Sequence, residues 1–230
     1  MKANRRIAVI LTAGCALMLM MPLRTASADS FEDLSAEWWQ WALSIPTTVN
    51  PQVDTTGKHA VVGQRGKVWF LAGVFAGTSA ERTCSVPEGT ALFFPVINSV
   101  QINAPNVCGQ GPADLTVEDM RATAAAEVDK ATNVSVTVDG ATIKNVRRIK
   151  SKLFAVALPE DNVFDLLCVG ELGGVPAGIY SPAVHDGFYV LVDKLSAGPH
   201  SLEFVAEDSS QNPPLQHVIY HLTVVPVSTK

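Results

Sequence analysis

Residues 187–225, GFYVLVDKLSAGPHSLEFVAEDSSQNPPLQHVIYHLTVV, contain three consecutive strand patterns and indicate a mainly β fold. Apolar side chains occupy both alternating faces of residues 187–193, which predicts a strand that is covered on both sides. Residues 200–206 and 217–224 alternate between apolar and polar positions, as half-buried strands do. The predicted inward positions are Leu202, Phe204, Ala206, Val218, Tyr220, Leu222 and Val224. The three segments predict the closing meander of an antiparallel β-sandwich, either jelly-roll or immunoglobulin-like.

Two helical patterns lie upstream of this stretch. In the first, Asp29 or Ser30 can cap a helix that Pro46 ends. Its apolar stripe consists of Leu34, Trp38, Trp41 and Ile45. A tryptophan cluster also suits sugar stacking or a membrane interface, but the shared stripe favours packing onto the sheet. The second helix begins at the capping-box pattern of residues 116–119. Both helices are expected at the periphery of the sandwich.

Four further segments have strand patterns, namely residues 68–74, 90–97, 134–146 and 152–158. The third of these is a hairpin around the Asp139-Gly140 turn. Pro95 predicts an edge position or a bulge in the second, because proline cannot donate to a strand ladder. No linker divides the chain after residue 28, so we expect one domain over residues 29–230.

The first 28 residues have the three regions of a secretory signal peptide. Three basic residues among the first six precede an apolar run over residues 7–21, and the small residues 26–28 provide a cleavage site. The run is shorter than the ~20 residues of a membrane span, so cleavage is expected rather than anchoring. Cys15 lies inside the run and not at its end, which argues against lipidation. We therefore expect a secreted or periplasmic protein without membrane contact after signal cleavage.

Charge limits the classes of partner. Cleavage after residue 28 removes four of the 17 basic residues and none of the 22 acidic ones, so the mature net charge is −9. Nucleic acid phosphates and anionic lipid surfaces repel such a chain. The expected partners are a glycan, a polar small molecule or an envelope protein, and no nucleic acid.

The cysteines predict one disulfide. Cys15 leaves with the signal peptide, so Cys84, Cys108 and Cys168 remain, and three pairings are open. A bridge is expected to persist in an oxidising compartment. We favour Cys108–Cys168, because each lies in a long irregular segment that a cross-link would restrain. Cys84 is then free or available to a second chain.

Two long connections, residues 98–114 and 159–186, are the expected place for a ligand site. If Cys108 and Cys168 are bridged, both connections lie at the same end of the molecule. The candidate ligand-binding residues are Asn98, Gln101, Tyr180, His185 and Asp186, with Arg82 as a partner from another loop. This mixture of neutral amides, an aromatic ring and titratable groups suits a polar neutral ligand. His217 and His221 lie on one strand face about 13 Å apart, so no metal site is predicted.

Local motifs assign no activity. The sequence contains no G-x-S-x-G elbow, P-loop, dinucleotide fingerprint, H-E-x-x-H or C-x-x-C, so no cofactor is expected. The favoured function is a non-catalytic exported protein with a binding, accessory or envelope-associated role. The alternative is an extracytoplasmic hydrolase or lyase acting on a polysaccharide or small molecule. Its acid and base groups would be Asp186, His185 and Glu81.

A tryptophan-rich N-terminal helix, the strand of residues 68–73 and the ending from Asp186 to His200 occur together in this chain. In these features the chain resembles secreted bacterial β-rich proteins of unassigned activity. The resemblance is scattered over the mature chain and includes no catalytic signature. It implies export and a β-rich domain, and it carries no residue roles.

Overall fold

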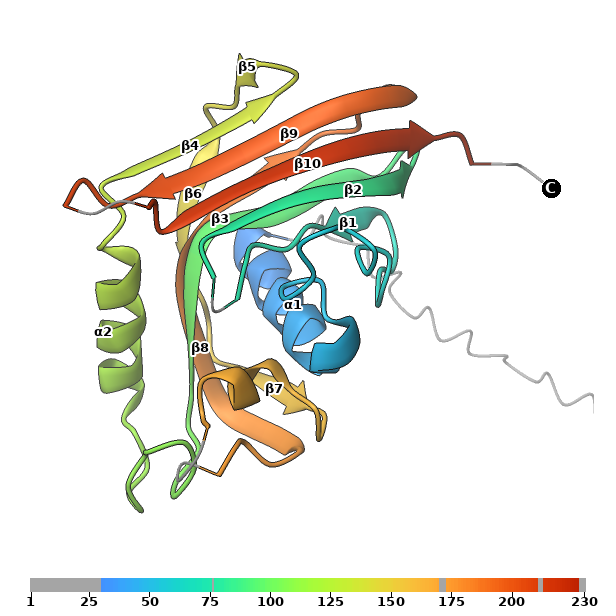
Figure 1. Cartoon of the computed structure of the whole chain (residues 1–230). Coiled ribbons are helices and arrows are strands. Elements are labelled where there is room, and N and C mark those ends of the chain that lie inside the picture. The colour runs from blue at the N-terminus through green and yellow to red at the C-terminus, as the bar shows by residue number, and fades with distance from the viewer. Residues whose placement is uncertain (1–29, 76, 170–172, 211–212, 228–230) are drawn as a thin grey trace, which may run out of the picture.

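The computed structural model describes residues 30–75, 77–169, 173–210 and 213–227 (Figure 1). The expected signal peptide, residues 1–28, lies outside these described residues. The described chain is mainly β, with two α-helices and two mixed five-stranded sheets. None of the helices in this part of the chain is long and apolar enough to cross a membrane.

The first sheet consists of β1 (Val68–Phe70), β3 (Ala91–Ile102), β6 (Val146–Lys150), β7 (Phe154–Leu158) and β8 (Gly178–Val192). Strand β3 runs antiparallel along one edge of β8, while β6 and β7 follow one another along its other edge. Strand β1 pairs in parallel with the start of β3. The register of β3 against β8 shifts between Pro95 and Ile97, where the sequence predicts an edge position or a bulge.

The second sheet consists of β2 (Ser79–Pro87), β10 (Gln216–Val225), β9 (Gly198–Glu207), β4 (Asn133–Val138) and β5 (Ala141–Thr142), in that order. Strands β9 and β10 form an antiparallel pair, whereas β2 pairs in parallel with β10. The prediction of purely antiparallel sheets is therefore wrong at β1–β3 and at β2–β10. The predicted closing meander is wrong in part, because β8 belongs to the first sheet while β9 and β10 belong to the second.

Strand β2 is absent from the sequence prediction because its inward face contains a charged residue. Its exposed and buried positions alternate strictly along most of its length. The buried positions are Ala80, Arg82, Cys84 and Val86. Since Arg82 interrupts the apolar alternation, the hydrophobic pattern alone does not identify the strand.

Adjacent residues of β3 point into two hydrophobic cores on opposite faces of the first sheet. Phe94 stacks on Phe204 of β9 with ring centroids 5.0 Å apart, in the core between the two sheets. Phe93 stacks on Tyr189 of β8 at 5.5 Å, in the core between the first sheet and helix α1 (Phe31–Ser44). Both faces of β8 are therefore covered, as predicted.

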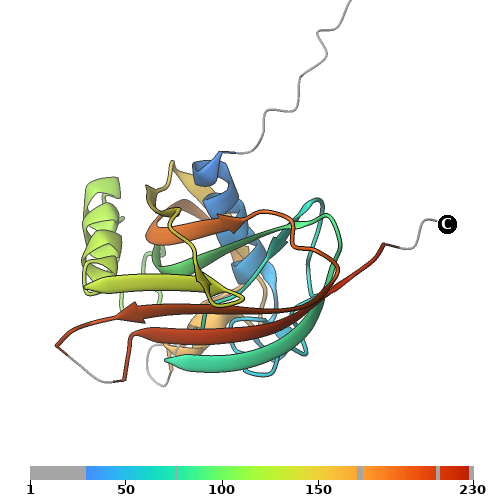
Figure 2. The ribbon, with the colours of Figure 1, turned by 90° about the horizontal axis from the view of Figure 1, so that it is seen from above.

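Both helices begin at the predicted caps. The hydroxyl of Ser30 accepts a hydrogen bond from the backbone N–H of Asp33, and Thr116 caps helix α2 (Val117–Val128) in the same way. Figures 1 and 2 show β3 and β8 between α1 (blue) and α2 (green). Trp38 is fully buried and donates its indole N–H to the Leu71 carbonyl at 2.9 Å. Helix α1 thus packs onto the first sheet, as its apolar stripe predicts.

Candidate functional site

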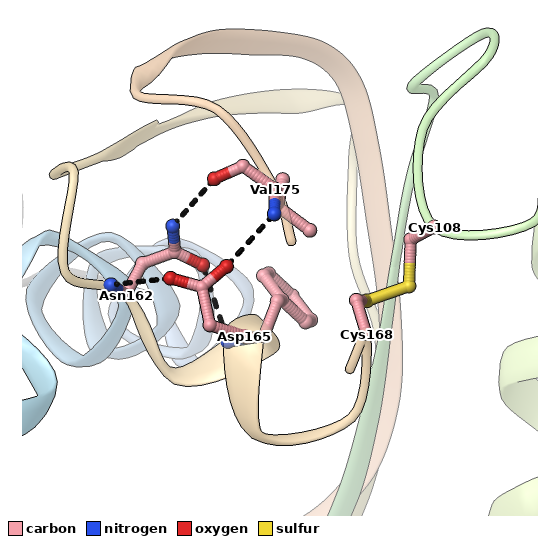
Figure 3. Close-up of a disulfide and its surroundings, with 6 residues drawn as sticks. Cys108, Asn162, Asp165, Cys168 and Val175 are labelled. Atoms are coloured by element: carbon pink, nitrogen blue, oxygen red, sulfur yellow. Dashed lines mark hydrogen bonds between the residues drawn. A yellow bond between two sulfur atoms is a disulfide. The ribbon is translucent and has the colours of Figure 1, made fainter. Parts of the chain in front are cut away.

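The predicted disulfide is present. Cys108 and Cys168 are bonded, with their Cα atoms 5.1 Å apart (Figure 3). Cys84 is the free cysteine within the described ranges, and burial raises the pKa of its thiol to about 11. The bridge ties the connection after β3 to the connection between β7 and β8. These two segments therefore lie side by side, as the predicted site requires.

The connection between β7 and β8 contains the short 3₁₀ turn η2 (Val163–Leu166). Hydrogen bonds join the two ends of this connection around the turn. The Asn162 side-chain amide donates to the Val175 carbonyl at 2.7 Å (Figure 3). The Asp165 carboxylate accepts from the backbone N–H of Val175 at 2.8 Å and from that of Asn162 at 3.3 Å. Side chains on this turn consequently hold defined positions beside the disulfide.

Three of the predicted site residues lie inside β8 and not in the loop before it. The predicted loop over residues 159–186 is wrong from Gly178 onward, because the strand begins there. His185 and Asp186 are 1 % and 2 % exposed, and neighbours in a strand point to opposite faces. Tyr180 is half-buried and donates its hydroxyl to the Pro176 carbonyl at 2.7 Å. The structure does not bring these three side chains together.

Asp186 forms a bidentate ion pair with Arg148 on the α2 side of β8. Arg148 on β6 donates from Nε and from Nη2 to the two carboxylate oxygens, each at 2.9 Å. Its Nη1 bonds to Asp129, at the end of α2, at 2.6 Å. The hydrogen bonds to Asp186 and then Asp129 raise the pKa of Arg148. The carboxylate of Asp186 therefore joins β8, β6 and α2.

His185 lies in a buried polar chain on the α1 side of β8. Its Nδ1 is 3.3 Å from the Tyr189 hydroxyl, which accepts from the Asn98 amide at 3.3 Å. Its Nε2 is buried and has no hydrogen-bond partner among the described residues. Burial, aided by the positive charge of Arg121, lowers the pKa of His185 to about 3. The imidazole is consequently neutral at neutral pH.

Arg82 forms its hydrogen bonds with backbone carbonyls and with Tyr220. The side chain is 1 % exposed and donates to the backbone carbonyls of Asp54, Ala72 and Gly73 and to the Tyr220 hydroxyl. A buried guanidinium is tolerated where each donor finds an acceptor. Arg82 thereby fixes the chain that follows β1, and it does not approach His185 or Asp186 through any described contact.

Asn98 and Gln101 do share a cavity. Both belong to β3, so the predicted loop over residues 98–114 is wrong up to Ile102. They line a pocket of about 760 Å³, which we call the edge pocket. Its polar lining consists of Gln52, Asn98, Ser99, Gln101, Glu127, Lys130, Asp208 and Gln216. Its apolar lining consists of Trp39, Val74, Phe75, Ile97, Val100, Phe164, Leu167 and Leu215.

Neutral amides make up half of the polar side chains that line the edge pocket. The Gln52 side chain is 3 % exposed, and its amide nitrogen has no acceptor among the described residues. The Gln216 side-chain oxygen accepts from the backbone N–H of Val74 at 3.3 Å. Amide groups both donate and accept, so they suit hydroxyl, amide and carbonyl groups of a ligand.

The charged residues of the edge pocket are already paired. Lys130 donates to Glu127 at 2.5 Å. Asp208 accepts from the hydroxyl of Ser210 at 2.6 Å and from its backbone N–H at 2.9 Å, and these bonds lower the pKa of Asp208. A general acid needs a raised pKa, which this carboxyl lacks. Lys130 and Asp208 thus both have partners among the described residues.

Several residues of the edge pocket are absent from the sequence prediction. Gln52, Phe75, Phe164 and Gln216 come from four separate connections and strand ends, which meet only in the folded chain. No spacing along the chain indicates that they are neighbours. The amide composition of residues 98–103 was the signal that led to Asn98 and Gln101.

A second cavity, of about 450 Å³, lies beside helix α1 and is lined by Trp41, Phe70, Glu37 and Arg65, among others. Trp41 is 7 % exposed and donates its indole N–H to the Val62 carbonyl at 2.9 Å. Its ring also contacts that of Phe70, with centroids 5.5 Å apart. The indole is thus committed to packing, as the shared stripe predicts.

Within the described ranges, no group of three or more His, Cys, Asp or Glu side chains is placed to hold a metal ion. His217 and His221 point outward on β10 and pair instead with Glu203 and Glu81, each at 2.7 Å. Comparisons of the chain with protein-family models, with curated proteins and with solved structures found no match.

Proposed function

We propose that this chain is an exported, non-catalytic β-sandwich protein that binds a neutral polar ligand in the edge pocket. The observation that carries the proposal is the lining of that pocket, where four side-chain amides surround a cavity of about 760 Å³. Ligand pockets typically measure about 300–1,000 Å³ and combine apolar walls with a few polar groups. The aromatic rings of Phe75 and Phe164 supply such a wall.

Export rests on the N-terminal sequence pattern and is compatible with the Cys108–Cys168 bridge. The sandwich description rests on the shared core between the two sheets. The sheets face each other through apolar side chains, as the layers of a sandwich do.

The alternative, an extracytoplasmic hydrolase or lyase, receives no support from the residues named for it. His185 and Asp186 face opposite sides of β8, and Glu81 pairs with His221 on the outer face of the second sheet. Acid–base catalysis needs two groups within reach of one substrate. No described contact brings two of these three side chains together.

A ligand screen tests the proposal. The chain from residue 29 to 230 is screened by ligand-observed NMR against neutral oligosaccharides, polyols and terminally blocked short peptides. We expect a binder whose affinity falls about tenfold in Gln101→Ala, because one amide contact is lost. The matched control is Asn145→Ala, an exposed amide away from the pocket, which should bind as the unmodified chain does.

Two results would count against the proposal. In the first, no compound of the three classes binds, or binding is equal in Gln101→Ala and Asn145→Ala. In the second, the same chain turns over a polysaccharide or an ester, and the hydrolase or lyase then replaces the binding protein.

A further inference from the structure

Strand β3 has an open edge where it borders the edge pocket. Strand β1 pairs with residues 91–93 only, and Leu71 donates to the Phe93 carbonyl at 3.0 Å. From Asn98 to Ile102, β3 pairs with β8 alone, and its backbone groups bond to no described residue outside β8. The other edge of this segment is therefore an unpaired row of main-chain N–H and C=O groups.

Hydrogen bonds on β8 show which residues of β3 face that edge. The backbone N–H of His185 donates to the Ser151 hydroxyl at 2.8 Å, and its carbonyl accepts from the Ser151 N–H at 3.0 Å. Both groups therefore point away from β3. Val100 is the direct partner of His185 across the ladder. In a non-hydrogen-bonded antiparallel pair, the backbone N–H and C=O groups of the two residues point away from each other. The N–H and C=O of Val100 therefore point away from β8, toward the open edge.

The same alternation assigns the neighbouring residues. The backbone N–H and C=O groups of Asn98 and Ile102 point toward the open edge, as those of Val100 do, while those of Ser99 point toward β8. The Asn103 N–H donates to the Pro182 carbonyl of β8 at 3.2 Å. This bond supports the assignment, because Asn103 is an odd number of residues from Val100 and should therefore direct its backbone groups toward β8. The open edge thus presents donor and acceptor groups from every second residue, about 6.8 Å apart.

Two walls of different chemistry flank the open edge. On the α1 and η2 side the pocket is lined by the rings of Trp39, Phe75 and Phe164. On the other side Lys130 follows the end of α2, and Asp208 follows the end of β9. Successive side chains of a strand added to β3 would point alternately to the aromatic wall and to the charged wall.

We propose that the edge pocket binds an extended peptide segment of another protein, which adds to β3 as a new edge strand. The inference rests on the proposed function and specifies the class of its ligand. Main-chain groups at two-residue spacing match another peptide strand, whereas a glycan lacks the repeating N–H and C=O groups of a peptide backbone. The segment that fits best alternates apolar residues with polar ones.

A single strand fits this edge better than a second copy of the chain. The open segment is short, since the irregularity at Pro95 lies on one side of it and β3 ends at Ile102 on the other. Helix α2 and turn η2 stand on its two flanks (Figure 1). A folded sheet approaching edge to edge would meet these flanks, but one extended segment lies between them.

A peptide-binding experiment tests the inference. The probe is a fluorescein-labelled pool of terminally blocked eight-residue peptides, in which Val, Leu or Phe alternates with Ser, Thr or Gln. A second pool has the same composition in blocks. We expect the alternating pool to bind at least tenfold more tightly to the 29–230 chain. Each binder is then N-methylated at one residue at a time, and we expect a tenfold or greater loss at every second position only.

The matched variants are Val100→Pro and Val100→Ala. Proline removes the outward N–H at a position where an edge strand tolerates it, and we expect peptide binding to be lost. Alanine keeps the N–H and should bind within about threefold of the unmodified chain. If Val100→Pro does not fold, the N-methyl scan alone decides, since it leaves the protein unchanged.

The other outcomes each overturn the inference. Peptide binding that is indifferent to N-methylation and to Val100→Pro excludes strand addition. Binding of oligosaccharides without peptides refutes the inference and leaves the proposed function standing, whereas binding of neither refutes both. If the unmodified chain forms a concentration-dependent dimer that Val100→Pro prevents, that result would show that a second copy of the chain occupies the edge.

Discussion

At the scale of single residues, β8 shows how alternation separates chemistry that is adjacent in sequence. Asp186 points toward α2 and meets Arg148, whereas His185 points toward α1 and meets Tyr189. A buried ionised carboxylate is tolerated because Arg148 supplies two hydrogen bonds. A buried histidine in a mostly apolar site is tolerated because it remains neutral. Both residues therefore stabilise the fold from opposite faces of the same strand.

The buried imidazole predicts loss of stability in mild acid. His185 titrates at a pKa of about 3 in the folded chain and near its ordinary 6.5 when unfolded. The unfolded chain therefore binds the extra proton between these values, so the stabilisation is complete above pH 6.5 and is lost as pH falls toward 3. Between pH 7 and pH 5 we expect His185 to account for about 2 kcal/mol of lost unfolding free energy.

Urea unfolding at pH 7 and pH 5 measures this contribution. The loss should shrink by about 2 kcal/mol in His185→Gln, which cannot titrate in this range. The control is His217→Gln on the outer face of β10, which removes a histidine and leaves His185 in place. An unchanged dependence in His185→Gln would mean that other groups cause the acid sensitivity.

At the scale of elements, helix α1 is held by its tryptophans. Trp38 contacts the rings of Trp39 and Trp41 edge-on, with centroids 5.0 Å and 5.9 Å apart. All three side chains are buried, although only Trp38 and Trp41 lie on the predicted stripe. The helix has seven buried residues, against three in α2. Helix α1 is therefore the more strongly anchored of the two.

Truncation of Trp41 should destabilise the protein substantially. We expect Trp41→Ala to lower the free energy of unfolding by about 3–5 kcal/mol, because a large ring and its hydrogen bond to Val62 are lost. Trp41→Phe keeps an aromatic ring and should lose clearly less. Chemical denaturation of the three proteins gives the comparison. Equal midpoints for Trp41→Ala and the unmodified chain would refute the packing role.

At the scale of the whole molecule, the disulfide and the open edge lie in neighbouring parts of the fold. Cys168 follows turn η2, and Phe164 of that turn lines the edge pocket. The bridge closes a loop with a sequence separation of 60 residues. It thereby restrains the wall of the pocket as well as the connection after β3.

Removal of the bridge should lower global stability. A loop of this length corresponds to about 4 kcal/mol of unfolding free energy if the bridge acts on the unfolded chain. We expect the double variant Cys108→Ala/Cys168→Ala to show that loss in urea unfolding, while Cys84→Ala loses less. Thiol counting on the denatured, unreduced 29–230 chain should find one free thiol. Three free thiols would refute the bridge.

Features that depend on the local order of residues can be predicted from this chain without its three-dimensional structure. The cap at Thr116, the cap at Ser30 (one of two candidates) and the tight turn at Asp139-Gly140 were predicted, because neighbouring residues form them. The inward face of β9 and β10 was also predicted, since alternation is a local property. The Cys108–Cys168 pairing was selected from three open pairings by the irregular segments around these cysteines.

Which elements become neighbours is visible only in the folded chain. The parallel pairings, the assignment of β8 to the first sheet and strand β2 with its buried Arg82 depend on contacts between distant segments. The same holds for the site, where Asn98 and Gln101 were predicted but the amides and rings around them were not. The open edge of β3 exists because β1 ends at Phe70. The sequence of β3 does not indicate where β1 ends.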